Sequence, residues 1–254
     1  IEQMASDFMK LYPAANILVA TEKDFAASKR KLFISRIATG EFDCVIMSQE
    51  QFKKIKISPE REKKFIEEEI DNIDRELLLL KHSKTRGHSV KSLELKKKQL
   101  AVKLTQLLGD IEANADTDNL SFEELGIDAL FVDEAHAYKN LPITTKMNVA
   151  GIASSNSQAA LDMLAKCQYI NEISKEHNVV FATGTPVSNT MGELYVMQSY
   201  LQPSALRKAH VDRFDEWAAN FGEVVTELEM NVQGSDFRFK NRFSKFVNIP
   251  ELMT

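Results

Sequence analysis

The sequence predicts an α/β domain in which helices flank a parallel sheet and an antiparallel coiled-coil hairpin is inserted. Two short apolar runs, at 127–132 and 178–182, end in polar residues, as buried parallel strands do. Between residues 60 and 112, leucine and isoleucine recur at intervals of three and four, which indicates two helical arms. The length of 254 residues suits one such domain with an insertion, or two small domains, and a hydrophobic content of 44% supplies a core.

Residues 1–58 are expected to form the first part of the sheet domain. Two apolar segments, 17–21 and 42–48, have the length and composition of buried strands, and the pattern at 24–38 between them favours a helix. An amphipathic helix precedes the first of these strands. The chain begins at Ile1 inside that helical pattern, so we interpret it as a piece of a larger protein.

A helical hairpin insertion is expected over residues 59–113. Apolar residues at heptad spacing occupy two segments that a short polar loop joins, which predicts an antiparallel coiled coil. The loop is basic and could contact DNA; the alternative is a solvated tip. Its basic residues are Lys81, His82, Lys84, Arg86 and His88.

Residues 114–204 are expected to complete the sheet domain. A polar linker leads to a short helix that Gly126 closes, and the strand at 127–132 follows. A long helix at 157–176 then precedes the strand at 178–183. This alternation of strands and helices is typical of a parallel sheet.

Residues 205–254 are expected to form a C-terminal helical segment. Phe214, Trp217 and Phe221 share one face of a helix, and aromatic and basic residues are interleaved at 237–246. We interpret the second stretch as a basic–aromatic helix that either binds nucleic acid or packs on a neighbour.

Acidic residues directly follow the first apolar run. Asp133 and Glu134 would lie at the carboxyl edge of the sheet, where ligands bind in open α/β folds. There, one carboxylate can hold a hydrated magnesium ion and the other can polarise an attacking water. The alternative is that the pair only caps the next helix. Because the second apolar run ends in Thr183, Gly184 and Thr185, both loops could meet at one edge.

These stretches resemble motifs of a known family. Asp-Glu-Ala-His at 133–136, followed by Lys139 and Asn140, resembles motif II (Walker B) of superfamily 2 helicases, particularly Swi/Snf-type DNA translocases. Residues 183–189 resemble motif III. The resemblance implies a RecA-like lobe, the first of two in a motor. Large phage and mobile-element helicase polypeptides, some fused to adenine DNA methylases, are also similar.

The resemblance assigns roles to individual residues. Asp133 would bind magnesium, Glu134 would activate the lytic water, and His136 would hydrogen-bond toward Thr183 or Thr185, coupling hydrolysis to DNA. A satisfied core histidine is the alternative for His136, and a plain strand-to-helix cap is the alternative at positions 21 and 23. The coupling candidates are Thr183, Gly184, Thr185 and Asn189. The nucleic-acid candidates are Thr21, Lys23, Ser48, Lys139 and Asn140.

One required part is missing from the sequence. None of the nine glycines is followed by lysine, so there is no Gly-x-x-x-x-Gly-Lys phosphate loop. ATP and Mg²⁺ are therefore expected as cofactors of the parent protein, and this segment should be inactive alone. The expected partners are double-stranded DNA, a second RecA-like lobe in the same polypeptide and a DNA methylase module. The other hypothesis is a non-catalytic module that docks a protein or DNA through its hairpin.

Composition sets further bounds. A net charge of −5 gives no overall attraction to nucleic acid, so DNA contacts would need a local basic patch. Cys44 and Cys167 are few enough to be free thiols in a reducing cytosol. No apolar run approaches the length of a membrane span, which favours a cytoplasmic protein. The resemblance to phage and mobile-element helicases implies a bacterial or phage origin.

Overall fold

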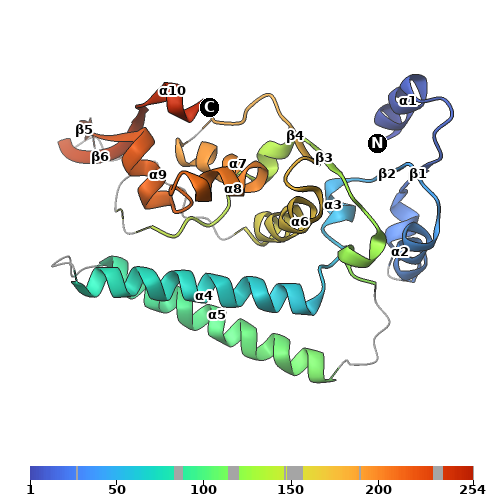
Figure 1. The fold of residues 1–254 in the computed structure, drawn as a ribbon, viewed down its shortest axis with the longest axis horizontal. Helices are drawn as coiled ribbons and strands as arrows, with labels where there is room; N and C mark the ends of the chain where they lie inside the picture. Colours follow the sequence, from blue (N-terminus) through green and yellow to red (C-terminus); the bar gives the residue numbers. More distant parts are fainter. Residues whose placement is uncertain are drawn as a thin grey trace.

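The computed structural model describes residues 1–26, 28–82, 88–113, 120–145, 147, 157–188, 190–230 and 237–253. In that part of the chain, helices surround three separate two-stranded sheets, two parallel and one antiparallel (Figure 1). The predicted coupling residue Asn189 lies outside the described residues. So do Lys84 and Arg86 of the predicted basic loop and positions 114–119 of the predicted linker.

The first parallel sheet joins β1 (Ile17–Val19) to β2 (Cys44–Ile46). Its flanking elements are α1 (Glu2–Leu11), the 3-10 helix η1 (Glu22–Phe25), α2 (Arg30–Thr39) and the short α3 (Gln49–Phe52). Both predicted strands are therefore confirmed. The predicted helix at 24–38 is instead divided into η1 and α2.

The second parallel sheet joins β3 (Leu130–Asp133) to β4 (Val179–Ala182), with Asp133 opposite Ala182 in the register. Between the two strands the chain passes through η3 (Ala135–Tyr138) and the long helix α6 (Gln158–Ser174), and α7 (Gly192–Leu201) follows β4. The predicted parallel strands and the helix between them are confirmed. A single RecA-like sheet joining both pairs stays a prediction.

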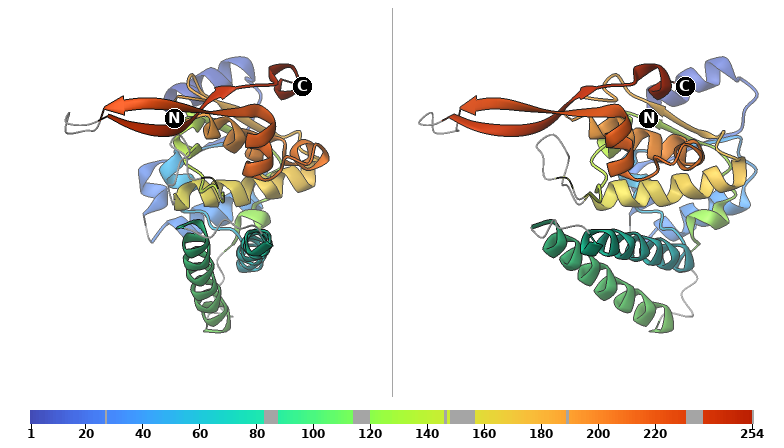
Figure 2. Two further views of the ribbon diagram at one scale, coloured as in Figure 1. Left: turned by 90° about the vertical axis from the view of Figure 1, so that its left-hand side faces the viewer. Right: turned by 60° about the vertical axis from the view of Figure 1, so that its left-hand side comes forward.

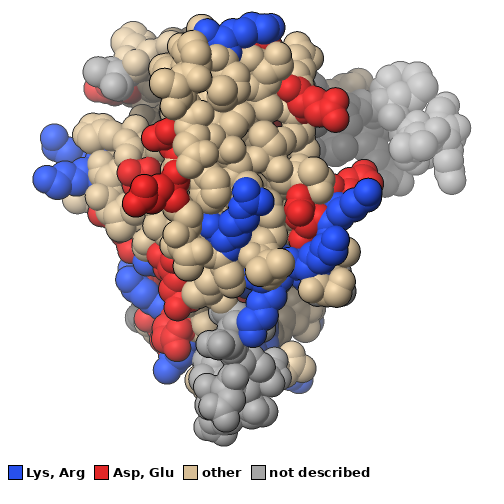
Figure 3. Space-filling model, turned by 90° about the vertical axis from the view of Figure 1, so that its right-hand side faces the viewer, with Lys and Arg blue, Asp and Glu red and all other residues tan. Residues whose placement is uncertain are grey.

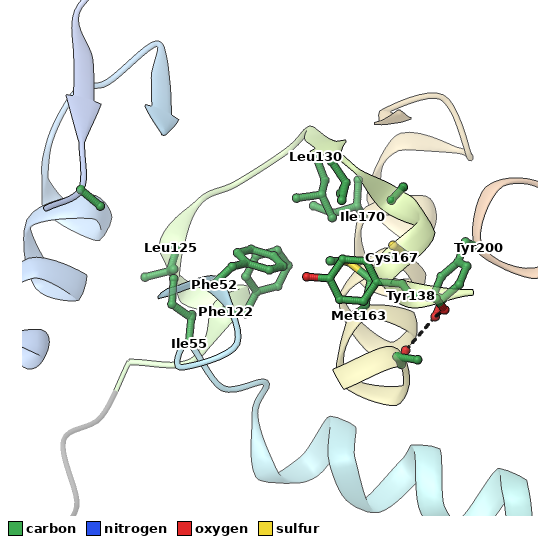
Figure 4. Packing of buried hydrophobic residues seen from close by; sticks show 14 of the residues in the cluster. Phe52, Ile55, Phe122, Leu125, Leu130, Tyr138, Met163, Cys167, Ile170 and Tyr200 are labelled. Carbon is green, nitrogen blue, oxygen red and sulfur yellow. Dashed lines mark hydrogen bonds between the residues drawn. The ribbon is translucent and has the colours of Figure 1, made fainter. Parts of the chain in front are cut away.

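The main core lies against α6. Phe52, from α3, and Phe122, from η2 (Phe122–Leu125), meet edge to face with ring centroids 5.7 Å apart, beside Met163 and Cys167 of α6 (Figure 4). The hydroxyl oxygen of Tyr200 lies 3.0 Å from the carbonyl oxygens of both Tyr138 and Ala160, either of which can accept its hydrogen bond. The core thus binds η3, α6 and α7 into one support for β3 and β4.

The insertion consists of α4 (Pro59–His82) and α5 (His88–Ala113), which lie beside one another (Figures 1 and 2). Ile73, Leu80 and Leu93 form a small buried cluster between them. Lys97, which takes a seam position in the predicted heptads, directs its Nζ to within 2.5 Å of Asp74 Oδ1. The coiled-coil arrangement itself stays a prediction.

The C-terminal part corrects the sequence interpretation. After α8 (Pro203–Lys208) and α9 (Phe214–Phe221), the chain forms an antiparallel ribbon of β5 (Gly222–Met230) and β6 (Phe237–Phe246), then α10 (Ile249–Leu252). The predicted basic–aromatic helix at 237–246 is wrong. Aromatic and basic residues alternate there with a period of two, which is the period of a strand. The ribbon projects from the body, and its base packs Phe243 against Phe214 (Figure 2).

Candidate functional site

Two loops meet where β3 and β4 end. Because the strands are parallel and Asp133 pairs with Ala182, the segments beginning at Glu134 and Thr183 leave the same edge of the sheet. The predicted adjacency of these two loops is therefore confirmed. At this edge polar side chains from both loops come within hydrogen-bonding distance.

The backbone at Glu134 takes an unusual conformation. Its φ of 53° and ψ of 43° lie in the left-handed region, which is uncommon for a residue other than glycine and recurs at functional sites. Asp133 Oδ1 accepts a hydrogen bond from the Glu134 amide at 2.9 Å, which supports the turn. Both residues are exposed, so their carboxylates are open to a ligand.

His136 joins the two loops. Its Nδ1 lies 3.1 Å from Glu134 Oε2 and 3.3 Å from Thr183 Oγ1. Thr183 Oγ1 also accepts a hydrogen bond from the Thr185 amide at 3.2 Å. His136 is therefore not the satisfied core histidine of the alternative interpretation, because its side chain is 44% exposed. It contacts one predicted catalytic residue and one predicted coupling residue.

Two glutamines that the sequence analysis missed hold this edge in place. Gln49 Nε2 donates to the carbonyl oxygen of Asp133 at 2.8 Å, and Gln51 Nε2 donates to that of Thr21 at 2.9 Å. Both belong to α3, so this helix connects the end of β1 to the end of β3. The available signal was the Ser48-x-x-Gln51 capping box, which the structure contains.

A buried lysine of α6, Lys166, holds the last residue of α3. Lys166 Nζ donates to the carbonyl oxygen of Phe52 at 3.0 Å and to Asp162 Oδ2 at 2.7 Å, and it lies 4.2 Å from the centre of the Phe52 ring. Burial lowers the pKa of Lys166 and raises that of Asp162, although the ion pair opposes both shifts. This contact ties the helix that carries Gln49 to α6.

Lys139 requires a correction. It was predicted to contact nucleic acid, but its side chain is only 7% exposed and its Nζ lies 3.2 Å from Glu193 Oε2. The ammonium also bonds the Ser188 hydroxyl, and Glu193 accepts a hydrogen bond from the Ser188 amide at 2.7 Å. The ammonium of Lys139 is therefore held inside the protein. It connects the segment after β3 to the helix after β4 instead.

Two other predicted DNA contacts, Thr21 and Ser48, both bond Gln51, through the Thr21 carbonyl oxygen and the Ser48 hydroxyl. Thr21 Oγ1 bonds Asp24 and Ser48 Oγ accepts from the Gln51 amide, so both hydroxyls serve as helix caps. Lys23 and Asn140 are exposed. The end of the molecule that carries α1 and α2 shows acidic and basic side chains interspersed (Figure 3).

The oxygen ligands at this edge suit one of the two ways in which proteins bind magnesium. No group of three or more histidine, cysteine or acidic side chains that could cage a metal occurs among the residues that the structure describes. Exposed carboxylates at Asp133 and Glu134 fit the other mode of magnesium binding, in which one or two carboxylates hold an ion that keeps waters and phosphate oxygens. The residues present fit a magnesium–nucleotide complex.

Comparison with known proteins identifies the family. Over 118 residues the chain is 29% identical to the "Defense against restriction protein B" of Escherichia phage P1. The aligned segment covers 44% of this chain and 5% of the phage protein. The chain therefore corresponds to a small part of that relative. No solved structure matches it. In the described part of the chain, none of the helices is long and apolar enough to cross a membrane. A family model for a "Probable helicase domain" matches residues 1–254, so the chain belongs to this probable helicase domain family.

Proposed function

We propose that this chain is one part of an ATP-dependent DNA helicase or translocase and that the ends of β3 and β4 form half of its nucleotide site. The observation that carries the proposal is the parallel register that sets Asp133 and Glu134 beside Thr183, with His136 between the two loops. Membership of the helicase family supports the same class of activity.

The two exposed acids have separate roles in this proposal. Asp133 ends β3 and would hold the magnesium ion of the nucleotide, while Glu134 would orient and deprotonate the attacking water. The bound ion supplies positive charge against the phosphate oxygens in the transition state. Because Gln49 holds the carbonyl group of Asp133, the direction of the acidic turn is fixed before the nucleotide binds.

His136 carries the coupling step. Its Nδ1 lies within hydrogen-bonding distance of both Glu134 Oε2 and Thr183 Oγ1. A shift of the loop after β4 would therefore change the position of the catalytic acid. Loop movement upon DNA binding would act through this contact. The phosphate loop, the second RecA-like lobe, the DNA-binding surface and any methylase module would belong to other parts of the polypeptide.

ATP turnover by the full-length protein tests the proposal. Glu134→Gln keeps the shape of the side chain but removes the base, so we expect ATP binding to persist and DNA-stimulated hydrolysis to fall by about 10²-fold or more. Asp128→Asn is the matched control, because Asp128 is an exposed acid just before the same strand. Wild-type hydrolysis in the Glu134→Gln variant would refute the assignment.

A second candidate function rests on the insertion. Leu78 and Leu79 of α4 are 56% and 50% exposed, and an apolar surface of this kind can dock a partner. In that case the domain is a scaffold. A full-length protein that neither binds nor hydrolyses ATP, but loses a protein partner on Leu78→Lys substitution, would favour this function.

A further inference from the structure

Glu134, the acid to which the proposed function assigns the attacking water, has a left-handed backbone. Its φ of 53° and ψ of 43° are costly for a residue with a side chain, because the Cβ atom approaches the carbonyl oxygen that follows. Such a conformation persists only where its surroundings hold it. Contacts beside the end of β3 must therefore favour this form of Glu134 over the extended form that would continue the strand.

Gln49 supplies such contacts. Its Nε2 lies 2.8 Å from the carbonyl oxygen of Asp133 and 3.4 Å from the carbonyl oxygen of Glu134. These carbonyl groups belong to the two peptide units on either side of the Glu134 Cα atom, so their directions depend on its φ and ψ. Successive carbonyl groups point the same way in a helical conformation and in opposite directions in a strand. One amide group that reaches both carbonyls therefore disfavours the extended form.

The chemistry of a glutamine suits this position. Both partners of Gln49 are carbonyl oxygens, which only accept hydrogen bonds, so the atom that faces them must be the amide nitrogen. That nitrogen carries two N–H donors and can serve two acceptors at once. A methionine side chain has a similar length but no donor, and it therefore could not hold the two carbonyl groups.

The helix that carries Gln49 is held from two sides. Gln51 of α3 is buried, and its Nε2 donates to the Thr21 carbonyl at 2.9 Å, just beyond the end of β1. From α6, Lys166 donates to the Phe52 carbonyl at 3.0 Å. α3 is thus fixed between the first parallel sheet and α6 (Figure 1). Gln49 therefore extends from a rigid support, which a precise site requires.

The geometry points to Gln49 as a positioning residue, which holds Glu134 in the left-handed conformation from which its carboxylate acts on the attacking water. In this conformation Glu134 Oε2 also lies 3.1 Å from Nδ1 of His136. Gln49 acts through Glu134 and need not touch the nucleotide. The inference rests on the proposed function, because the orientation of Glu134 matters only if this acid is the base. A catalytic group displaced by about 1 Å can cost about 10²-fold in rate, so the loss of Gln49 should lower kcat.

Steady-state ATP hydrolysis by the full-length protein tests this role. Gln49→Met removes both donors, and we expect kcat to fall by about 10- to 100-fold while the KM for ATP changes by less than about threefold. Gln49→Asn keeps the amide but is one carbon shorter, so it should show the same loss of kcat. Gln99→Met, at an exposed position of α5, is the matched control and should behave as wild type. Wild-type kcat in either Gln49 variant, or a change in KM alone, would overturn the proposal.

A second background separates positioning from a general structural effect. In the Glu134→Gln variant the base is already lost, so adding Gln49→Met should lower the single-turnover rate by less than about twofold more. The same further loss as in wild type would show that Gln49 does not act through Glu134, and the proposal would be wrong.

The two proposals can fail separately. If Glu134→Gln abolishes hydrolysis while Gln49→Met keeps a normal kcat, the positioning role is contradicted and the proposed function stands. If Glu134→Gln hydrolyses ATP as wild type does, the proposed function fails, and the positioning role fails with it.

Discussion

Lys139 Nζ lies 3.2 Å from Glu193 Oε2, and the two side chains are only 7% and 2% exposed. The pair connects the segment that follows β3 to the first turn of α7, which follows β4. Both loops of the candidate site adjoin these segments, so the ion pair links the two sides of the site. Removing one charge breaks an ion pair at a buried site, which is costly.

Lys139→Met should therefore destabilise residues 1–254 by about 3–5 kcal/mol. Adding Glu193→Gln should recover part of the loss, because the buried charge then disappears. Urea unfolding can be followed by the fluorescence of Trp217, the one tryptophan of the sequence, which is fully buried. Lys64→Met is the control: Lys64 is 65% exposed, and its substitution should cost at most about 0.5 kcal/mol. A similar loss of stability in the Lys139→Met and Lys64→Met variants would contradict this prediction.

The contact between His136 and Thr183 predicts a coupling phenotype. His136→Ala or Thr183→Val should each lower the DNA-stimulated ATP hydrolysis of the full-length protein by roughly tenfold, because a hydrogen bond between the loops is lost. The double variant should be little worse than either single variant. Thr105→Val, on α5, should have no effect. Fully multiplicative losses in the double variant would argue that the two residues act separately.

Acidification should weaken the fold through the cap before β3. Ser121 donates to Glu124 from its amide at 2.6 Å and from its hydroxyl at 2.7 Å, and these hydrogen bonds lower the pKa of Glu124 from its ordinary value of 4.5. A lowered pKa stabilises the folded state above the ordinary value, and that contribution is lost as the pH falls through the folded pKa.

The urea midpoint of residues 1–254 should therefore decrease between about pH 5 and about pH 3, and Glu124→Gln should flatten this decrease. Glu2→Gln, in the exposed α1, serves as the control. If Glu124→Gln leaves the pH dependence unchanged, the cap contributes nothing to the acid sensitivity.

The sequence alone predicts the parallel pairs well, for a physical reason. The runs that became β3 and β4 are short and apolar and end in polar residues, so burial and chain direction together determine how they pair. The placement of Asp133 and Glu134 next to Thr183 and Thr185 follows from that pairing. No contact between distant residues had to be known.

The errors arise where tertiary contacts decide. Lys139 looks like a surface cation because its partner Glu193 lies on a helix much further along the chain, and only the fold brings the two together. Gln49 bonds backbone groups, which leave no mark in a sequence pattern. At 237–246 aromatic and basic residues alternate with a period of two, which indicates the observed strand and not the predicted helix.

The most direct measurement of the central claim is the metal dependence of ATP hydrolysis by the full-length protein with Asp133→Cys. A thiolate is a poor ligand for Mg²⁺ but a better one for Mn²⁺. If Asp133 holds the nucleotide's metal, the rate with Mg²⁺ should fall by about 10²-fold and Mn²⁺ should restore it by about tenfold or more, while wild type shows no such preference. Equal rates with the two metals in the variant, or no loss with Mg²⁺, would contradict the account.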